Sequence, residues 1–424
     1  MSACSTPSAT MNTVFMPEKG VDRLRLAMPT EIFYEITDWI DSPEDLRAFT
    51  LACRLFAAIA SPRHTQLRSL RCPLGALCFW EALAADAALA RNVRHIDIQD
   101  RICPYRGQWQ FPKSFCKANP DCWHCYARPD FTDDREMWQR VEKPMMAAFA
   151  NMSSLISLKW ESILYRFPLV EPGTNRDDIW TALRSYSSMT ALYVEEGDMG
   201  GIFHSSNIFT LSNLTFLEYK TEIFGFEGLP SDGEALGIML RERCPKLQTL
   251  KLCFPDPICE GYPPPLFGRS VLSGQWPDLE HVQLEGVACH AEEASSFLVA
   301  NPNIRSLEVD EFFSCRPLAG ALDHVTDQDL VELPLTLPPA VLPKLCTLRC
   351  APGHAADILA SIKTLGIGPP RPHLTVTLTN AHPWHPRMRD LYGVGILTDT
   401  TSITFNANDF TRSIIASAGR SADE

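Results

Sequence analysis

The sequence predicts an α/β protein in which an N-terminal helical module is followed by an array of repeated strand–loop–helix units. Apolar residues recur at helical spacing between residues 26 and 60, and a short strand pattern recurs eight times further along the chain. The composition agrees, because 45% apolar residues suffice for a large core and 33 prolines are typical of many short elements joined by loops.

The length of 424 residues suits several domains or one elongated array. The patterns change at boundaries that divide the chain into a helical part and a repeated part. We expect a disordered tail over 1–20, the helical module over 21–65, a helical linker over 66–92, the array over 93–405 with insertions at 99–135, 255–275 and 311–343, and a flexible tail over 406–424.

The charge balance limits the classes of partner. A formal net charge of −13 and a pI near 5.4 argue against nucleic acid or an anionic membrane as the main partner. The sequence contains no run of 18 apolar residues, so no membrane span is predicted. The first 20 residues lack the pattern of a signal peptide. We therefore expect a protein of the cytoplasm, the nucleus or both.

The first helix is predicted from Pro29, which suits the first helical position because the amide that it lacks would have no intrahelical partner there. Ile32, Ile36 and Ile40 recur every fourth residue and line one face, while Phe33 and Trp39 widen that face. One short helix cannot bury so broad an apolar surface.

A second helical run is predicted after the break at Asp41, with start signals at Ser42-Pro43-Glu44. It continues through Cys53 to Ala60, because its apolar residues keep the three-and-four spacing. Those residues are Leu46, Phe49, Ala52, Cys53 and Phe56. A unit of about 40 residues is small for a self-sufficient core, so we expect it to pack on a partner.

Four groups of residues in this module resemble the F-box motif. They are Met28-Pro29-Thr30-Glu31-Ile32, Ile36, Asp45-Leu46 and Cys53-Arg54-Leu55-Phe56. Met28 stands where the motif usually has Leu, and Ala52 where it usually has Val. The resemblance implies a module that binds a Skp-type adaptor and, through it, a cullin. The residues that it implies as candidates for contact with the adaptor are Met28, Pro29, Ile32, Ile36, Leu46 and Leu51. The alternative is that these are ordinary core residues of a helical hairpin.

After a helix expected over Leu67–Ala90, the apolar period changes to two. The template apolar-x-x-apolar-x-apolar then starts at Val93, Leu155, Met189, Leu214, Leu247, Leu279, Ile304 and Leu345. Looser strands are expected at Leu374–Leu378 and Ile403–Phe405. Between the strands, helical segments are expected at Asp177–Tyr186, Gly233–Arg243, Glu292–Val299 and Ala355–Thr364.

Units of this kind, spaced 25 to 41 residues apart from Leu155 onward, resemble the long, irregular leucine-rich repeats found beside F-boxes in fungal proteins. The asparagine position of that family is not kept. Each unit has an apolar edge that it cannot bury alone, so we expect stacking into a solenoid with parallel strands on a concave wall and helices outside.

Alternate strand residues are predicted to point out from that wall. The twelve residues predicted to point outward include six acidic and four basic ones. We take the wall as a hypothetical binding face for a protein target, with some preference for a basic one. The candidate target-binding residues are Glu161, Glu195, Glu218, Glu285 and Glu308. The alternative is a solvated face without a partner.

Most of the fifteen cysteines lie inside apolar patterns and, without a secretory signal, are expected as free thiols that pack as small hydrophobes. Examples are Cys53, Cys244, Cys253, Cys289, Cys346 and Cys350. Cys122 and Cys125 have the two-residue spacer of a zinc site, which Cys103 and Cys116 would complete. Cys103 and Cys116 lack such a spacer. The sequence therefore favours ordinary loop or core thiols over a zinc site, and no cofactor is expected.

No catalytic motif is present. Gly-x-Ser-x-Gly, a phosphate-binding Gly-x-x-x-x-Gly-Lys loop and His-Glu-x-x-His are all absent from the sequence. We therefore expect a non-enzymatic subunit that recognises substrates for a Skp–cullin–F-box ubiquitin ligase. Two alternatives stay open: a leucine-rich-repeat scaffold outside the ligase, and a metal-dependent interaction protein built on the cysteines between residues 103 and 125.

Overall fold

A computed structural model shows two compact units, residues 1–62 and 63–424, and we describe each by itself. The described residues are 29–61, 63–99, 115, 134–162, 177–196, 207–221, 234–254, 268–287, 289–310, 313, 315–317, 330–363, 374–378 and 402–405. The two expected tails, 1–20 and 406–424, and most of the three expected insertions lie outside these residues.

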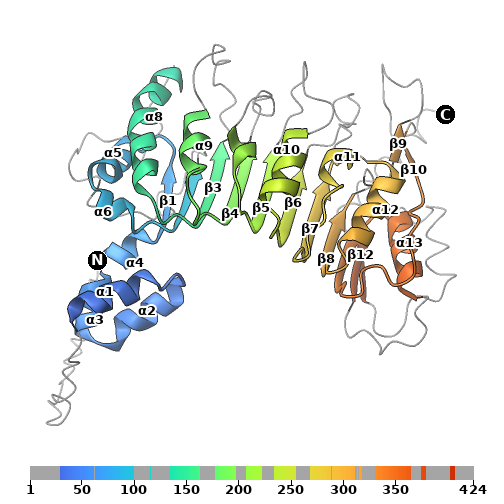
Figure 1. Cartoon of the computed structure of the whole chain (residues 1–424), viewed down its shortest axis with the longest axis horizontal. Coiled ribbons are helices and arrows are strands. Elements are labelled where there is room, and N and C mark those ends of the chain that lie inside the picture. The colour runs from blue at the N-terminus through green and yellow to red at the C-terminus, as the bar shows by residue number, and fades with distance from the viewer. Residues whose placement is uncertain are drawn as a thin grey trace, which may run out of the picture. The chain divides into compact units, whose positions relative to one another are not determined.

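The described part of the first unit contains three helices, α1 (Thr30–Asp38), α2 (Pro43–Ala52) and α3 (Arg54–Ala60) (Figure 1). Pro29 is the N-cap of α1, one residue before the predicted position. The start of α2 is as predicted, because the Ser42 side chain accepts a hydrogen bond from the amide of Asp45 and Pro43 opens the helix.

The prediction of one continuous helix from Ser42 to Ala60 is wrong. Cys53 is in an extended conformation with φ −160° and ψ 166°, so it ends α2 and begins α3. Its sulfur accepts a hydrogen bond from the amide of Phe56 at 3.5 Å, which caps the new helix. The apolar spacing continues across this break, so periodicity alone did not reveal it.

The second unit contains an eleven-stranded sheet whose strands follow one another in chain order (Figure 1). Each neighbouring pair is parallel. The strands are β1 (Ser69–Pro73), β2 (His95–Gln99), β3 (Ser157–Ser162), β4 (Ala191–Glu196), β5 (Phe216–Thr221), β6 (Thr249–Cys253), β7 (His281–Glu285), β8 (Ser306–Val309), β11 (Thr347–Cys350), β12 (Thr375–Leu378) and β13 (Ser402–Phe405). The eight template strands and the two looser ones are confirmed.

The first strand of the sheet was not predicted. Residues Leu67–Ala90 were expected as a helix, but Ser69–Pro73 forms β1 and pairs in parallel with β2. The helical part is shorter and consists of α5 (Leu77–Ala85) and α6 (Ala87–Ala90), after a five-residue helix, α4 (Arg63–Leu67). The repeated pattern therefore starts one strand earlier than the sequence analysis placed it.

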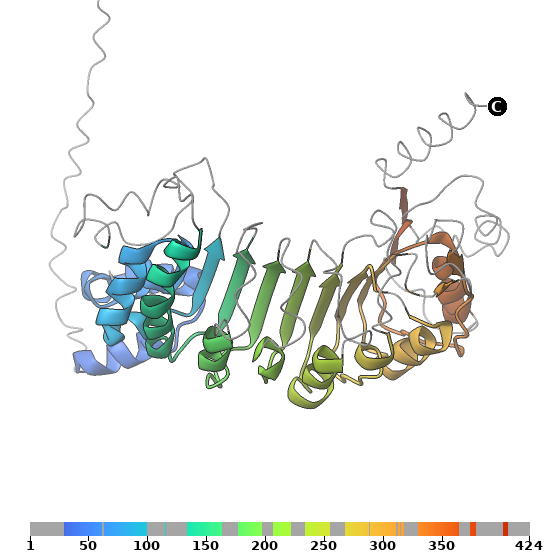
Figure 2. The same ribbon diagram turned by 90° about the horizontal axis from the view of Figure 1, so that it is seen from above.

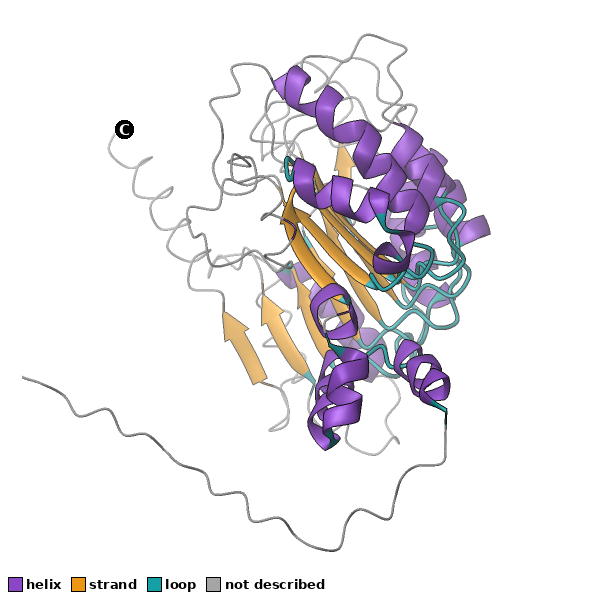
Figure 3. Ribbon diagram, turned by 90° about the vertical axis from the view of Figure 1, so that its left-hand side faces the viewer, coloured by secondary structure: helices purple, strands orange, loops and turns teal. Residues whose placement is uncertain are grey.

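Helical segments connect most of the strands and lie along one side of the sheet (Figures 2 and 3). They are α8 (Asp134–Asn151), α9 (Asp177–Leu183), the 3₁₀ helix η3 (Asn207–Thr210), α10 (Glu234–Ile238), the π-helical turn η4 (Met239–Arg243), α11 (Gly268–Val271), α12 (Ala291–Ala300) and α13 (Pro352–Lys363). Helices are present in all four segments where the sequence predicted them. Parallel strands need such crossovers, because the chain must return to the same edge before each new strand.

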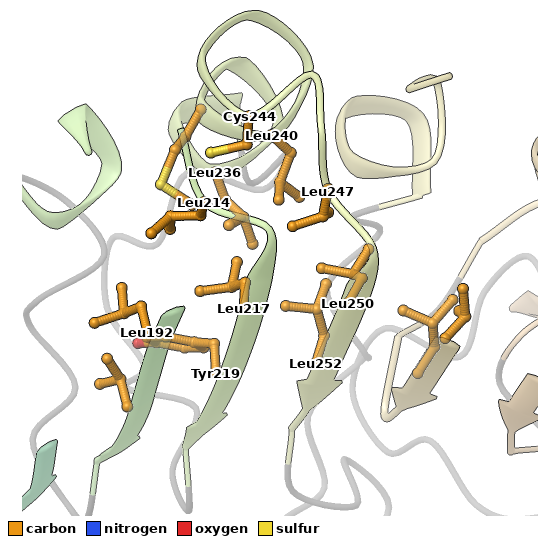
Figure 4. Packing of buried hydrophobic residues seen from close by; sticks show 14 of the residues in the cluster. Leu192, Leu214, Leu217, Tyr219, Leu236, Leu240, Cys244, Leu247, Leu250 and Leu252 are labelled. Atoms are coloured by element: carbon orange, nitrogen blue, oxygen red, sulfur yellow. The ribbon is translucent and has the colours of Figure 1, made fainter. Parts of the chain in front are cut away.

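The core lies between the sheet and these helices. In the strands, buried and partly exposed residues alternate, as in β6, where Leu250 and Leu252 are buried. Equivalent leucines of neighbouring strands pair in register, for example Leu192, Leu217 and Leu250. Figure 4 shows these side chains packing toward Leu240 and the other helical residues above them.

The entries into several strands repeat the same backbone geometry. The amide of Leu247 donates to the carbonyl of Cys244, and Leu279 and Leu345 make the same bond to Trp276 and Leu342. Each turn has proline at its second position, where the fixed φ of proline suits a turn. The same bond joins Val93 to Ala90 and Leu155 to Met152 without a proline, so proline favours this turn but is not required for it.

The insertion at 311–343 contains an element without a sequence signal. Its strands β9 (Cys315–Pro317) and β10 (Leu330–Glu332) form a separate antiparallel pair. Within the described residues, none of the helices has both the length and the apolar content that crossing a membrane requires.

Candidate functional site

The helical unit has a small aromatic core. The rings of Phe33 in α1 and Phe56 in α3 lie 5.0 Å apart, and Phe56 stacks on Phe49 of α2 at 4.2 Å. Leu46 and Ile59 are buried as well. These contacts join all three helices, so the unit uses one apolar face of each helix for its own packing.

A second set of large apolar side chains in this unit stays exposed. Of the seven exposed large hydrophobic residues in the described chain, six belong to residues 29–61. They are Ile32, Tyr34, Ile36, Trp39, Leu51 and Leu55. Ile32, Ile36 and Trp39 follow the spacing of one helix face, rotated from the face that Phe33 and Thr37 bury. We call these six residues the apolar set.

The predicted adaptor-facing residues divide into three groups. Pro29, Ile32, Ile36 and Leu51 are exposed, and Leu51 retains 77% of its accessible surface. Leu46 is only 2% exposed and packs inside the unit, which departs from its predicted surface role. Met28 lies outside the described residues. The exposed members leave apolar surface accessible to a partner, although Ile32 and Ile36 are exposed by only 37% and 41%.

Trp39 and Leu55 are exposed but were not among the predicted adaptor-facing residues. Trp39 keeps 86% of its surface, the largest value in the apolar set. The sequence carried a signal for it, since Trp39 lies seven residues after Ile32 and three after Ile36. Periodicity placed these residues together but did not tell which of the two apolar stripes of α1 would be buried.

The sheet brings the predicted target-binding glutamates onto one face. Their positions alternate with buried residues, and the register aligns Glu161 with Glu195 and Glu218 with Tyr193 on adjacent strands. We call this the polar face. Its positions are Ser69, Arg71, Pro73, His95, Asp97, Gln99, Ser157, Lys159, Glu161, Ala191, Tyr193, Glu195, Phe216, Glu218, Lys220, Thr249, Lys251, Cys253, His281, Gln283, Glu285, Ser306, Glu308, Thr347, Arg349, Thr375 and Thr377.

Most acidic residues of the polar face are paired with basic residues. Lys220 of β5 approaches Glu195 of β4 at 2.8 Å, and Lys251 of β6 approaches Glu218 of β5 at 3.2 Å. The other ion pairs of the face are Arg71–Asp97, Lys159–Glu161 and Arg349–Glu308. Four of the five predicted glutamates are therefore neutralised within the sheet, and Glu161 is also buried. The remaining glutamate, Glu285, accepts a hydrogen bond from Gln283 at 2.9 Å.

Burial shifts the pKa values of three partly buried groups on the polar face toward their uncharged forms. Burial raises the pKa of Glu308 above its ordinary value; Arg349 opposes this shift and the adjacent Glu285 adds to it. Burial, with Glu285 as the next cause, raises the pKa of the Cys253 thiol to about 12. Burial also raises the pKa of Tyr193. Burial therefore disfavours ionisation of these groups, and the carboxylate of Glu285 adds to this effect at Glu308 and Cys253.

The proposed zinc ligands Cys103, Cys116, Cys122 and Cys125 lie outside the described residues. In the part of the chain that is described, no group of three or more His, Cys, Asp or Glu side chains is placed to hold a metal ion. Cys244, Cys289 and Cys350 are buried free thiols, as expected, whereas Cys53 and Cys346 are exposed. Cys53 is exposed because it lies at the break between two helices.

The geometry defines an α/β protein with two candidate interaction surfaces, the apolar set and the polar face. A scan against protein-family models finds no match to this chain, and a search of curated proteins finds none either.

Proposed function

We propose that this protein is a substrate-recognition subunit of a Skp–cullin–F-box ubiquitin ligase. The helical unit binds the Skp-type adaptor, and the polar face of the repeated array binds a protein target. The chain contributes binding and proximity, while other subunits of the ligase supply the chemistry in the cytoplasm or nucleus. On this proposal the array is of the leucine-rich-repeat kind.

The observation that carries the proposal is the apolar set. The ring contacts that join the three described helices involve Phe33, Phe49 and Phe56, whereas Ile32, Ile36, Trp39 and Leu51 are exposed. Single exposed apolar residues are common on protein surfaces, but a concentration of them indicates an interaction site. Two of these residues, Ile32 and Ile36, also carry the resemblance to the F-box motif, in which apolar side chains meet the adaptor.

The array supports the proposal by contrast. Its described residues include a single large exposed hydrophobic side chain, Val299 of α12. An adaptor that is recognised through apolar contact is therefore expected to bind the helical unit. The array presents charged and polar side chains instead, which suit selection among targets more than permanent association.

The test is binding of the purified full chain to a purified Skp-type adaptor, measured by calorimetry and by gel filtration. We expect a complex for the wild type and a loss of affinity of about a hundredfold for the double variant Ile32→Asp, Ile36→Asp, because two carboxylates would be buried in an apolar interface. Trp39→Ser is expected to weaken binding as well, since exposed tryptophans are frequent binding hot spots.

Val299→Asp is the control, because it introduces an aspartate at an exposed aliphatic residue of the other unit. It should bind the adaptor like the wild type. A wild-type chain that does not bind the adaptor, or aspartate variants that bind unchanged, would contradict the proposal and favour a scaffold outside the ligase. Circular dichroism of each variant shows whether the helices are intact.

A further inference from the structure

Two aromatic rings lie side by side on the polar face. The ring centroids of Tyr193 in β4 and Phe216 in β5 are 4.3 Å apart with an interplanar angle of 34°. They are diagonal neighbours, because Phe216 is opposite Ala191 and Tyr193 is opposite Glu218. Both are partly exposed, and no other polar-face position in the described parallel sheet holds Phe, Tyr or Trp.

The surroundings of this ring pair are electrically balanced. The ammonium group of Lys251 lies 5.9 Å from the centroid of Phe216 and 3.2 Å from the carboxylate of Glu218. These two charges are neutralised by each other, and Lys251 also contributes a cation–π contact. The pair therefore offers a rigid, partly exposed apolar platform, a surface that suits a large apolar or aromatic side chain.

Two strands away, negative charge is in excess. Glu285 of β7 forms no ion pair with any cation among the described residues; it accepts a hydrogen bond from Gln283 and lies within hydrogen-bonding range of Glu308. Arg349 of β11, the nearest paired cation among the described residues, contacts Glu308. A basic group from outside would offset this excess.

The register of the sheet sets the distance between the platform and the excess charge. Phe216 aligns with Thr249 and then His281 across the strands, and Glu285 lies four residues beyond His281. Two strand spacings across and four residues along give a separation of about 16 Å. An extended segment covers this distance with about five residues.

We infer that the polar face binds a protein segment in which a large apolar or aromatic side chain precedes or follows a basic side chain by about five residues. The apolar side chain packs on Tyr193 and Phe216, and the arginine or lysine pairs with Glu285. This inference names the class of target for the proposed function and rests on it. It also narrows the earlier expectation of a basic target, because Glu195, Glu218 and Glu308 already have cations.

The experiment measures fluorescence anisotropy of synthetic Gly/Ser peptides that carry one Trp and one Arg, with the purified full chain at low salt. We expect the best affinity when the two side chains are separated by about five residues. Replacing Arg by Glu, or Trp by Ser, should weaken binding by about tenfold. Equal affinity for the Arg and Glu peptides, or no binding at any spacing, overturns the inference.

Two variants locate the binding site. Glu285→Gln should remove the preference for Arg over Glu and keep the preference for Trp, whereas Phe216→Ser should do the reverse. Glu280→Gln is the matched control, because Glu280 lies just before β7 and pairs with Arg305. Melting temperatures show that each variant is folded, and Phe216→Leu replaces Phe216→Ser if the latter is not. Peptide selectivity that is unchanged in the Glu285 and Phe216 variants overturns the inference.

Three further outcomes are informative. They distinguish a peptide segment from a second copy of the chain as the occupant of the polar face, and they distinguish failure of the ligase proposal from failure of the target class. If a second copy of the chain covers this face, sedimentation will show a dimer that Phe216→Ser dissociates, and the inference fails. If the adaptor does not bind but peptide selectivity is present, the ligase proposal fails and the target class stands. If the adaptor binds and the peptides are not discriminated, the target class fails alone.

Discussion

The two units treat their apolar side chains in opposite ways. The helical unit builds its core from Phe33, Phe49 and Phe56 and leaves a comparable set of large apolar residues exposed. The array buries its leucines between sheet and helices and presents charged residues that are largely paired. An element that exposes apolar surface gains stability by binding, whereas one that buries it is stable by itself.

Leucine-to-alanine substitutions test this contrast with the largest expected effect on stability. Leu250→Ala removes a fully buried side chain from the middle of the sheet and is expected to lower the free energy of unfolding by about 2–5 kcal/mol. Leu51→Ala is the same chemical change at a residue with 77% exposure, so its expected effect is within about 0.5 kcal/mol. Urea denaturation measures both values, and similar losses for the two variants would remove the contrast.

A buried polar residue provides the second test. Asn301 is fully buried; its amide nitrogen donates to the carbonyls of Gly274 at 3.2 Å and Phe297 at 2.9 Å, and its oxygen accepts from the amide of Trp276 at 2.8 Å. Asn301→Ala leaves these backbone groups without their partner. We therefore expect the free energy of unfolding, measured by urea denaturation, to fall by about 1–3 kcal/mol.

Asn303 offers a matched control for that change, because its only side-chain bond, to the carbonyl of Pro277, lies at an exposed site. Asn303→Ala should lower the free energy of unfolding by about 0.5 kcal/mol, since water replaces the lost partner. An effect of Asn301→Ala no larger than that of the control would show that the buried hydrogen bonds do not hold the two neighbouring repeats together.

Most of the strand architecture could be predicted from the sequence because each strand buries alternate residues, which leaves a period of two in the chain. The missed β1 also carried this signal: Leu67, Leu70 and Cys72 fit the template that located the other strands. The apolar residues around it favoured a helix instead. The break at Cys53 had no such signal, because the helical spacing continues through it.

The candidate site was less predictable. Periodicity showed that α1 is apolar on a broad arc, but Ile32 and Phe33 fit a buried face equally well, and only the packing of Phe33 on Phe56 decides between them. On the polar face, aligned templates place Lys251 beside Glu218, yet their contact depends on side-chain conformations that a sequence pattern does not contain. A count of acidic residues therefore overstated the charge that is available to a target.

The ion pairs of the polar face should contribute little to stability, in contrast to the core. In a double-mutant cycle with Glu218→Gln and Lys251→Met, we expect a coupling energy of about 0.2–1 kcal/mol, because both side chains are about one-third exposed. The coupling should decrease at high salt. The more exposed Glu280–Arg305 pair is the comparison and should couple less strongly. A coupling that is insensitive to salt would contradict a solvent-exposed pair.

The smallest effect is expected from the pH dependence of stability at Glu308. Because its folded-state pKa is raised above the ordinary glutamate value of about 4.3, its contribution to stability is fully present below that pH and is lost as pH rises through the folded pKa. Glu308→Gln cannot titrate, so the melting temperature of the wild type relative to this variant should decline over that range.

Glu285→Gln removes the neighbouring charge that helps to raise the pKa of Glu308, so in this background the decline should begin at a lower pH. Melting temperatures of the wild type, both single variants and the double variant, measured across the acidic range, separate the two groups. A relative melting temperature that rises with pH would mean that Arg349 outweighs burial at Glu308. The excess of negative charge that distinguishes β7 from the balanced pairs elsewhere on the polar face would then be absent.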